Sequence, residues 1–276
     1  MVSNCFRMRT FNAGGNHEIV LPNGKAVLVD PYFPDGAGLT REDVTGADYI
    51  ILTHCHYDHD GELGYFVRKF DAKVFCGALS AEEVMKYHRI PYNNLFPVFP
   101  NSKFTADNLT FEFFQAKHNL MNYAWSPDED RNKTRGVEGH RALDMFGSME
   151  SLDWMLTTSN GFRVMMCSGR TVFEDAFERC RALRPNVLLR QAGFRTDKNP
   201  TEQVSPAELA ALLARYRAQI VFPFHTEILE ARRGKEWVRT YMEQVRREME
   251  RLDPAAAFIY PEPYRWYSIG IEVACE

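Results

Sequence analysis

The chain has 276 residues, of which 45% are hydrophobic and 25% charged, which is enough for one large domain with a substantial core. Its formal net charge of −4 at pH 7 offers no overall attraction to nucleic acid or to an anionic membrane. No apolar run is long enough to span a bilayer, and we expect no signal peptide at the start of the chain. The six scattered cysteines are expected to be free thiols in a reducing cytoplasm.

The first half of the chain is predicted to contain short strands followed by helices. Strands are predicted at three apolar runs, residues 18–21, 26–30 and 49–52. The first two flank Pro22-Asn23-Gly24, whose composition predicts a hairpin turn. Helices are predicted over residues 62–70 and 80–87, the second because Ser80 and Glu83 have the spacing of a capping box.

The second half is predicted to follow the same plan. Strands are predicted at residues 109–116, 155–159, 162–167, 186–191, 219–224 and 264–273. Asn160-Gly161 predicts a hairpin. Ser205, Pro206 and Glu208 begin a helix predicted to end near residue 217, and an amphipathic helix follows over residues 234–252. Two strand-rich halves, each followed by helices, predict an α/β fold in which two sheets pack together with helices outside.

Residues 119–154 show no clear period and mix Tyr123, Trp125 and Trp154 with a cluster of charges. A stretch of this length without predicted structure is uncommon inside a compact domain. We therefore expect a single domain over residues 1–276 with an insertion at 119–154 that acts as a lid or pocket wall. A structural or oligomer-contact insertion is the alternative.

The most informative string of the sequence is THCHYDHDG, at residues 53–61. Imidazole and carboxylate groups are the ligands that hold zinc, iron or manganese. Alternate residues at the end of a strand point to the same side, so His54 and His56 are expected to lie together. The tight turn that follows can bring Asp58 and His59 to a second position nearby. Such a polar cluster beside a buried strand is costly unless it coordinates something, and it therefore predicts a metal site.

This string matches the HxHxDH motif of the metallo-β-lactamase superfamily, and the resemblance extends over nearly the whole chain. The family begins with a hairpin that ends in an Asp-Pro pair, as Asp30 and Pro31 do here. A later lone histidine after a strand is matched by His118. A histidine that follows a strand and a proline near the C-terminus is matched by His225.

The resemblance implies the four-layer αβ/βα metallo-β-lactamase sandwich, with the metal site at the edge between the two sheets. It also implies two metal-ligand sets, which are His54, His56 and His118 for one ion and Asp58, His59 and His225 for the other. The expected cofactor is one or two zinc ions, with manganese or iron as alternatives.

The resemblance also bears on other polar residues. Asp58, if it is not itself a ligand, would orient the attacking water or take its proton. His17 lies in a loop that the family places near the mouth of the site, where it would contact substrate; a plain loop residue is the alternative. His88 and His140 match no ligand position.

One departure concerns the bridging aspartate that the family usually carries in a Gly-Asp pair after a strand. Here Gly169 is followed by Arg170, a permanent cation that cannot ligate a metal. Each ligand set still offers the three protein ligands that a catalytic zinc uses. Three interpretations of Arg170 are open: an anchor for a substrate carboxylate or phosphate, the mark of a degenerate site, or a surface ion-pair residue.

We therefore expect a cytoplasmic metal-dependent hydrolase that uses metal-activated water on a small-molecule ester, lactone, amide or phosphoester. The partner is expected to be this small and, given Arg170, anionic substrate, with no nucleic acid and no membrane; a homo-oligomer is compatible with the sequence. Within the superfamily, the chain most resembles the small-molecule branch that includes ascorbate-phosphate lactonases. Two alternatives are a metal-binding sensor or binding module without turnover, and a mononuclear iron oxygenase.

Overall fold

The computed structural model describes residues 5–11, 15–33, 38–118, 139–170, 172–193 and 203–270. The chain divides into two compact units. Unit 1 comprises Met1–Pro97, Asn132–Phe146 and Glu262–Glu276, and unit 2 comprises Val98–Arg131 and Gly147–Pro261. Within the described residues, the helices lack the combination of length and apolar character that a bilayer crossing needs, and the five cysteines are free thiols.

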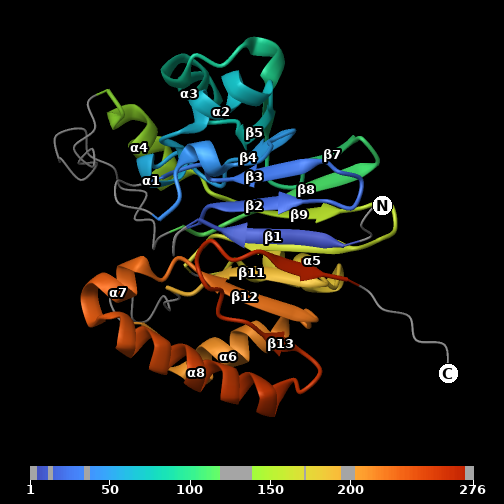
Figure 1. Cartoon of the computed structure of the whole chain (residues 1–276), viewed down its shortest axis with the longest axis vertical. Helices are drawn as coiled ribbons and strands as arrows, with labels where there is room; N and C mark the ends of the chain where they lie inside the picture. Colours follow the sequence, from blue (N-terminus) through green and yellow to red (C-terminus); the bar gives the residue numbers. More distant parts are fainter. Residues whose placement is uncertain are drawn as a thin grey trace. The chain divides into compact units, whose positions relative to one another are not determined.

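Unit 1 is built on a seven-stranded sheet in the order β14-β1-β2-β3-β4-β5-β6 (Figure 1). Its strands are β1 (Phe6–Thr10), β2 (His17–Val20), β3 (Ala26–Val29), β4 (Tyr49–Ile51), β5 (Lys73–Gly77), β6 (Leu95–Val98) and β14 (Tyr267–Ile269). The predicted hairpin is confirmed, because β2 pairs antiparallel with β3. Strands β3, β4 and β5 are parallel, so the residues that follow β3 and β4 meet at one edge of the sheet.

Unit 1 also contains helices and short helical turns. They are α1 (Tyr57–Asp60), α2 (Leu63–Phe70), α3 (Ala81–His88), the first part of α4 (Arg141–Met149), and two 3₁₀ turns, η1 (Arg41–Asp43) and η2 (Tyr92–Asn94). Leu63 and Phe66 of α2 join a buried cluster with Ile50 of β4 and Val74 of β5. Burial of this face accounts for the predicted helix at 62–70.

Helix α3 begins where the sequence predicts, but the predicted capping box is wrong. Ser80 has the helical backbone angles φ −91° and ψ −12°, and its side chain makes no cap hydrogen bond. The Ser80 hydroxyl instead donates to the carbonyl of Gly77 at 3.1 Å. An N-cap hydroxyl accepts from the first turn only when the cap residue itself is extended, and Ser80 is not.

Unit 2 is built on a second seven-stranded sheet, in the order β13-β12-β11-β10-β9-β8-β7. Its strands are β7 (Lys103–Ala106), β8 (Leu109–Gln115), β9 (Leu152–Thr157), β10 (Arg163–Cys167), β11 (Val187–Gln191), β12 (Ile220–Phe224) and β13 (Ala257–Phe258). The predicted Asn160-Gly161 hairpin is confirmed by the antiparallel pairing of β9 with β10. Strand β9 is antiparallel to both of its neighbours, β8 and β10, so β8 and β10 run in the same direction. Strands β10, β11 and β12 are parallel to one another. The residues after β8, β10, β11 and β12 therefore lie at one edge of the sheet.

Four helices complete unit 2: α5 (Glu174–Ala182), α6 (Pro206–Arg215), α7 (Glu227–Arg233) and α8 (Lys235–Leu252). Figure 1 shows α6 and α8 running together along one face of the sheet. Tyr241, Val245 and Met249 of α8 are buried in the same apolar cluster as Leu213 of α6. The apolar stripe that predicted an amphipathic helix at 234–252 is therefore the face of α8 that is buried.

The prediction of an unstructured insertion at 119–154 is wrong at its C-terminal end. Residues 119–138, including Tyr123 and Trp125, lie outside the described residues. Residues 141–149 form α4, and Trp154 belongs to β9 with its side chain fully buried. Strand β9 lies between β8 and β10, and a central strand buried on both faces lacks the alternation that makes a strand visible in sequence.

Candidate metal centre

The structure brings together the four HxHxDH residues of unit 1. His54 and His56 lie between β4 and α1, and Asp58 and His59 belong to α1. The ring of His54 lies 4.7 Å from that of His56 and 3.9 Å from that of His59, measured between centroids. Asp58 Oδ1 lies 3.9 Å from His59 Nε2. All three imidazoles are buried, so this is a dense set of metal-ligating groups at the end of a buried strand.

The tight turn after these residues depends on the space that Gly61 leaves. The Gly61 amide donates to the carbonyl of Tyr57 at 3.0 Å and closes α1. A Cβ atom at position 61 would lie 3.0 Å from that carbonyl oxygen and 3.0 Å from the ring of Tyr32. The φ of Gly61 is an ordinary −50°. Close approach, and not an unusual backbone angle, therefore requires glycine here.

Asp30 orients two of these histidines. Its Oδ2 accepts from His59 Nδ1 at 2.8 Å and from the Thr53 hydroxyl at 2.7 Å. Because that hydroxyl is already donating, the 3.0 Å contact between Thr53 Oγ1 and His54 Nδ1 is a hydrogen bond donated by the ring. Both rings therefore carry their proton on Nδ1 and turn Nε2 to the other side, as metal-binding histidines held by a carboxylate or hydroxyl do.

Asp30 is also held in an unusual conformation. It is fully buried and has a φ of +46°, a left-handed angle that costs free energy for a residue other than glycine. The amide of Thr53 donates to its Oδ1 at 2.7 Å. Strained polar residues of this kind gather at functional sites, and the Asp30–Pro31 pair of the sequence gave no sign of this role.

The start of α4 contacts the same loop. Asp144 accepts from His56 Nε2 at its backbone carbonyl (3.1 Å) and from the Tyr57 amide at Oδ1 (3.3 Å). The Cys55 thiol donates to the carbonyl of Leu143 at 3.1 Å. His140 Nδ1 lies 3.0 Å from Asp144 Oδ1. Burial disfavours the charged form of His140, but hydrogen bonds to Asp144 and Asp60 outweigh it and raise the pKa of His140 to about 9.

The predicted position of His17 is wrong. His17 is not a loop residue but the first residue of β2, paired with Val29 of β3, and its side chain is fully buried. Burial lowers the pKa of His17 to about 3, so the ring is neutral at neutral pH. Its contact with substrate stays a prediction.

In unit 2, the predicted site residues follow three strands that end at one edge of the sheet. His118 follows β8, Arg170 follows β10, and His225 follows β12. His225 has a φ of +62°, a second left-handed residue at a strand end. Its Nδ1 contacts the Glu227 carboxylate, which is again the pairing that holds a metal-binding imidazole.

A buried arginine that the sequence analysis missed holds the turn before Arg170. Arg190 of β11 is almost fully buried, and its guanidinium donates to the carbonyls of Cys167, at 3.2 Å, and Gly169. The Ser168 amide donates to Asp153 at 2.7 Å. Burial raises the pKa of Asp153 to about 6, although the nearby Arg190 charge opposes this. Hydrogen bonds from Arg190 and to Asp153 therefore hold the turn from which Arg170 extends.

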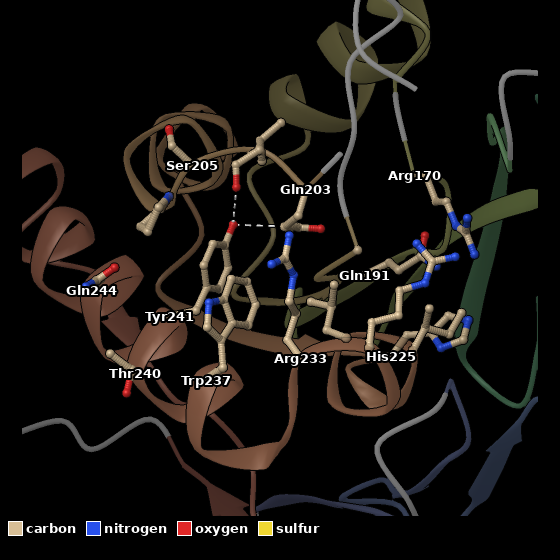
Figure 2. A pocket seen from close by; sticks show the side chains of 16 residues that line it. Arg170, Gln191, Gln203, Ser205, His225, Arg233, Trp237, Thr240, Tyr241 and Gln244 are labelled. Atoms are coloured by element: carbon tan, nitrogen blue, oxygen red, sulfur yellow. Dashed lines mark hydrogen bonds between the residues drawn. The ribbon is translucent and has the colours of Figure 1, made fainter. Parts of the chain in front are cut away.

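A cavity of about 460 Å³ opens beside His225 within unit 2. Figure 2 shows Arg170 and His225 at one end of it and Trp237, Thr240 and Gln244 at the other. Among the described residues that line it there is no carboxylate, and its main side chains are Arg170, Arg232, Arg233, Gln191, Gln203, Trp237 and Tyr241.

Stacking and hydrogen bonds hold the aromatic wall of this cavity. The rings of Trp237 and Tyr241 stack at 5.1 Å with 17° between their planes. The Tyr241 hydroxyl donates to the Val204 carbonyl at 2.8 Å and accepts from the Gln203 amide at 3.0 Å (Figure 2). The Arg233 guanidinium lies 5.7 Å from the Trp237 ring. The cavity thus joins a cationic end to a flat apolar wall.

Known proteins resemble the chain in sequence and in structure. Residues 18–141 match the family model of the metallo-beta-lactamase superfamily. A UPF0173 metal-dependent hydrolase of Staphylococcus aureus is 34% identical over 98 residues, 35% of this chain and 42% of that protein. Igni18, a metallo hydrolase from Ignicoccus hospitalis, has a TM-score of 0.69 at 15% identity, covering 97% of this chain and 100% of its own. An isothiocyanate hydrolase from Delia radicum gut bacteria has a TM-score of 0.64 at 14% identity, covering 96% and 100%.

These similarities establish the fold. The α/β metallo-β-lactamase fold class predicted from the sequence is confirmed, with one sheet and its helices in each unit. The structural neighbours, at 15% and 14% identity, are evidence for the fold alone. The chain spans 42% of the length of the curated relatives that it matches.

Proposed function

Since residues 18–141 match the family model of the metallo-beta-lactamase superfamily, we propose that the protein is a metal-dependent hydrolase of a small anionic substrate. The single observation that carries the substrate class is the cavity in unit 2, where the described lining residues include three arginines and a predicted metal ligand but no carboxylate. Arginine pairs with carboxylate and phosphate groups through two parallel hydrogen bonds, so an anionic group is the ligand that this lining suits.

The proposed metal ligands are those that the HxHxDH motif implies. They form two sets, His54, His56 and His118 for one ion and Asp58, His59 and His225 for the other. The donor chemistry suits a divalent ion, and zinc is the ion we propose. The hydrogen bonds from His59 to Asp30 and from His56 to the Asp144 carbonyl support this, because ligand histidines usually donate their other N–H to such groups.

When bound, the metal would lower the pKa of a water molecule and polarise the scissile group. The protein residues then have three tasks. Asp58, where it does not itself ligate a metal, orients the attacking water or accepts its proton. Arg170 binds the anionic group of the substrate and takes the place that a bridging carboxylate has in the family. The Trp237–Tyr241 stack binds a flat apolar portion, since aromatic rings pair best when offset and stacked.

The proposal is tested with matched substrates. Esters, lactones, amides and phosphoesters are prepared as pairs that differ only in whether a second group is a free carboxylate or its methyl ester. A hydrogen bond to a charged group contributes about 1.5–3 kcal/mol, so kcat/KM should favour the charged member about ten- to a hundredfold. Arg170→Gln should remove most of this preference through a higher KM.

Arg251→Gln is the control, because it removes one positive charge from α8 at an exposed position outside the cavity. It should leave the preference unchanged. Tight binding of anions without turnover of any pair, at full metal loading, would instead favour a sensor or binding module. Bound iron with oxygen consumption would favour the oxygenase alternative.

A further inference from the structure

A second cluster of metal-ligating side chains lies in unit 1, and none of its members belongs to the HxHxDH ligand sets. Asp60 is the last residue of α1, His88 is the last residue of α3, and His140 directly precedes α4. One ligand atom of each lies within 4.8 Å of the others. The exposed fractions are 0% for Asp60, 6% for His88 and 0% for His140. Three separate segments therefore bring these groups together away from solvent.

The Asp60 carboxylate is at the centre of this cluster. His88 Nε2 lies 3.0 Å from Oδ2, and His140 Nε2 lies 2.8 Å from Oδ1. Aromatic rings enclose the cluster: Tyr57 and Tyr87 lie 5.3 and 5.0 Å from the His140 ring. Tyr87 also packs edge-on against His88 at 4.8 Å. The cluster is therefore shielded from solvent, and a charge placed there is poorly solvated.

The charge on Asp60 needs a positive partner. Buried carboxylates are paired with a cation or coordinate a metal, because an isolated buried charge is very costly. Within the part of the chain that the structure describes, the side chains in contact with the Asp60 carboxylate are the two imidazoles, with no lysine or arginine. Either one imidazole carries a proton, or a metal ion lies among the three groups.

The surroundings of His140 also suit a metal ligand. Its Nδ1 lies 3.0 Å from Asp144 Oδ1, on the side of the ring opposite Asp60. A carboxylate that accepts from one ring nitrogen while the other faces a ligand cluster is the usual arrangement around a metal-binding histidine. Imidazole and carboxylate are also donor groups that zinc takes, and a water molecule would complete four-coordination.

We propose that Asp60, His88 and His140 form a structural site for a divalent transition-metal ion, separate from the HxHxDH ligands, and that zinc is the ion it takes. The ion would tie α1, α3 and the start of α4 to one another. It would thereby hold Asp144 against His56, since Asp144 follows His140 by one helical turn. This inference goes beyond the proposed function, because the ion here supports structure and carries no step of catalysis.

The test counts metal ions in matched variants. His88→Gln keeps a side-chain N–H that can donate to Asp60 but removes the imidazole. Lys86→Gln, two residues earlier on α3 and exposed, is the control. Each protein is stripped with chelator, reloaded with zinc, dialysed and analysed by mass spectrometry of the metal. We expect one zinc equivalent fewer per chain in His88→Gln and no change in Lys86→Gln.

A second background separates this site from the HxHxDH ligands. His88→Gln should also remove one zinc equivalent in a protein in which His54 and His56 are both changed to alanine. If the HxHxDH ligands bind no zinc, the site at His88 can therefore still be detected. Anomalous diffraction at the zinc edge needs no variant and should place a peak among the three side chains. An unchanged zinc count in His88→Gln, or anomalous peaks only at the HxHxDH residues, would overturn the proposal and leave a protonated imidazole between carboxylates.

Discussion

Single residues distant in the sequence orient the HxHxDH side chains. Asp30 precedes His59 by 29 residues and accepts from its Nδ1, and Asp144 follows His56 by 88 residues and accepts from its Nε2. Both acceptors are buried, so water does not compete for the hydrogen bonds. The orientations of the His56 and His59 rings are therefore set by residues outside the motif.

We predict that Asp30→Asn weakens metal binding without unfolding the chain. The amide keeps the size of the carboxylate, but it removes the negative charge that makes His59 a stronger ligand. Loss of such a partner costs about ten- to a hundredfold in metal affinity. Calorimetric titration of the metal-stripped protein with zinc measures this change. Asp48→Asn, at a partly exposed ion pair with Lys25, should bind zinc like the parent, and equal affinities in all three proteins would contradict the role given to Asp30.

The HxHxDH residues could be predicted from the sequence because their spacing is local. Two histidines at the end of a strand and an Asp-His pair in the next turn need only a few residues to specify their positions. The orienting residues could not be predicted in the same way. Asp144 lies in a helix that begins after residues without clear periodicity, and Arg190 belongs to a strand whose burial on both faces hides its one charged side chain.

At the scale of elements, two helices with the same starting signal begin differently. Ser205 is extended at φ −63° and ψ 158°, accepts from the Glu208 amide, and forms the complete capping box. Ser80 has the same spacing to Glu83 but forms no cap. Pro206 in the first turn of α6 fixes its own φ and favours an extended residue before it. The motif alone predicts that a helix begins, and the neighbouring proline decides whether the serine caps it.

We predict that Ser205→Ala lowers the free energy of unfolding by about 1 kcal/mol, because alanine leaves the first-turn amide of α6 without its acceptor. Ser205→Gly is the matched comparison and should cost only about a few tenths of a kcal/mol. Urea denaturation followed by circular dichroism measures both. A glycine variant less stable than the alanine variant would show that Ser205 acts through something other than the cap.

For the whole molecule, the net charge and the charge of the cavity lining have opposite signs. The chain carries a net charge of −4, yet three arginines and no carboxylate line the described wall of the cavity in unit 2. The net charge disfavours a general affinity for polyanions, but it carries no information about a single pocket. The fold class followed from the motif and the order of elements, whereas the pocket depends on side chains from several elements.

Two groups with shifted pKa values, His17 and Asp153, set opposite pH dependences for folding. Burial lowers the pKa of His17 to about 3, whereas an unfolded histidine titrates near about 6.5. Between these values the unfolded chain binds one more proton, so stability is lost as the pH falls. Burial raises the pKa of Asp153 to about 6, whereas an unfolded aspartate titrates near about 3.9. Between those values the folded chain holds the extra proton, so stability is gained as the pH falls.

We predict that single substitutions separate these two effects, which largely cancel in the parent between about pH 6 and 4. As the pH falls from 6.5 to 4, the stability of His17→Gln should rise relative to the parent by up to about 1.4 kcal/mol per pH unit. The stability of Asp153→Asn should fall relative to the parent by a similar amount below pH 6. Urea denaturation at a series of pH values, with chelator present so that metal release does not contribute, measures both differences.

If the two units unfold in separate transitions, the difference for His17→Gln belongs to unit 1 and the difference for Asp153→Asn belongs to unit 2. Parallel curves for the parent and His17→Gln would mean that His17 takes up a proton in the folded chain, and that its burial is relieved by local opening.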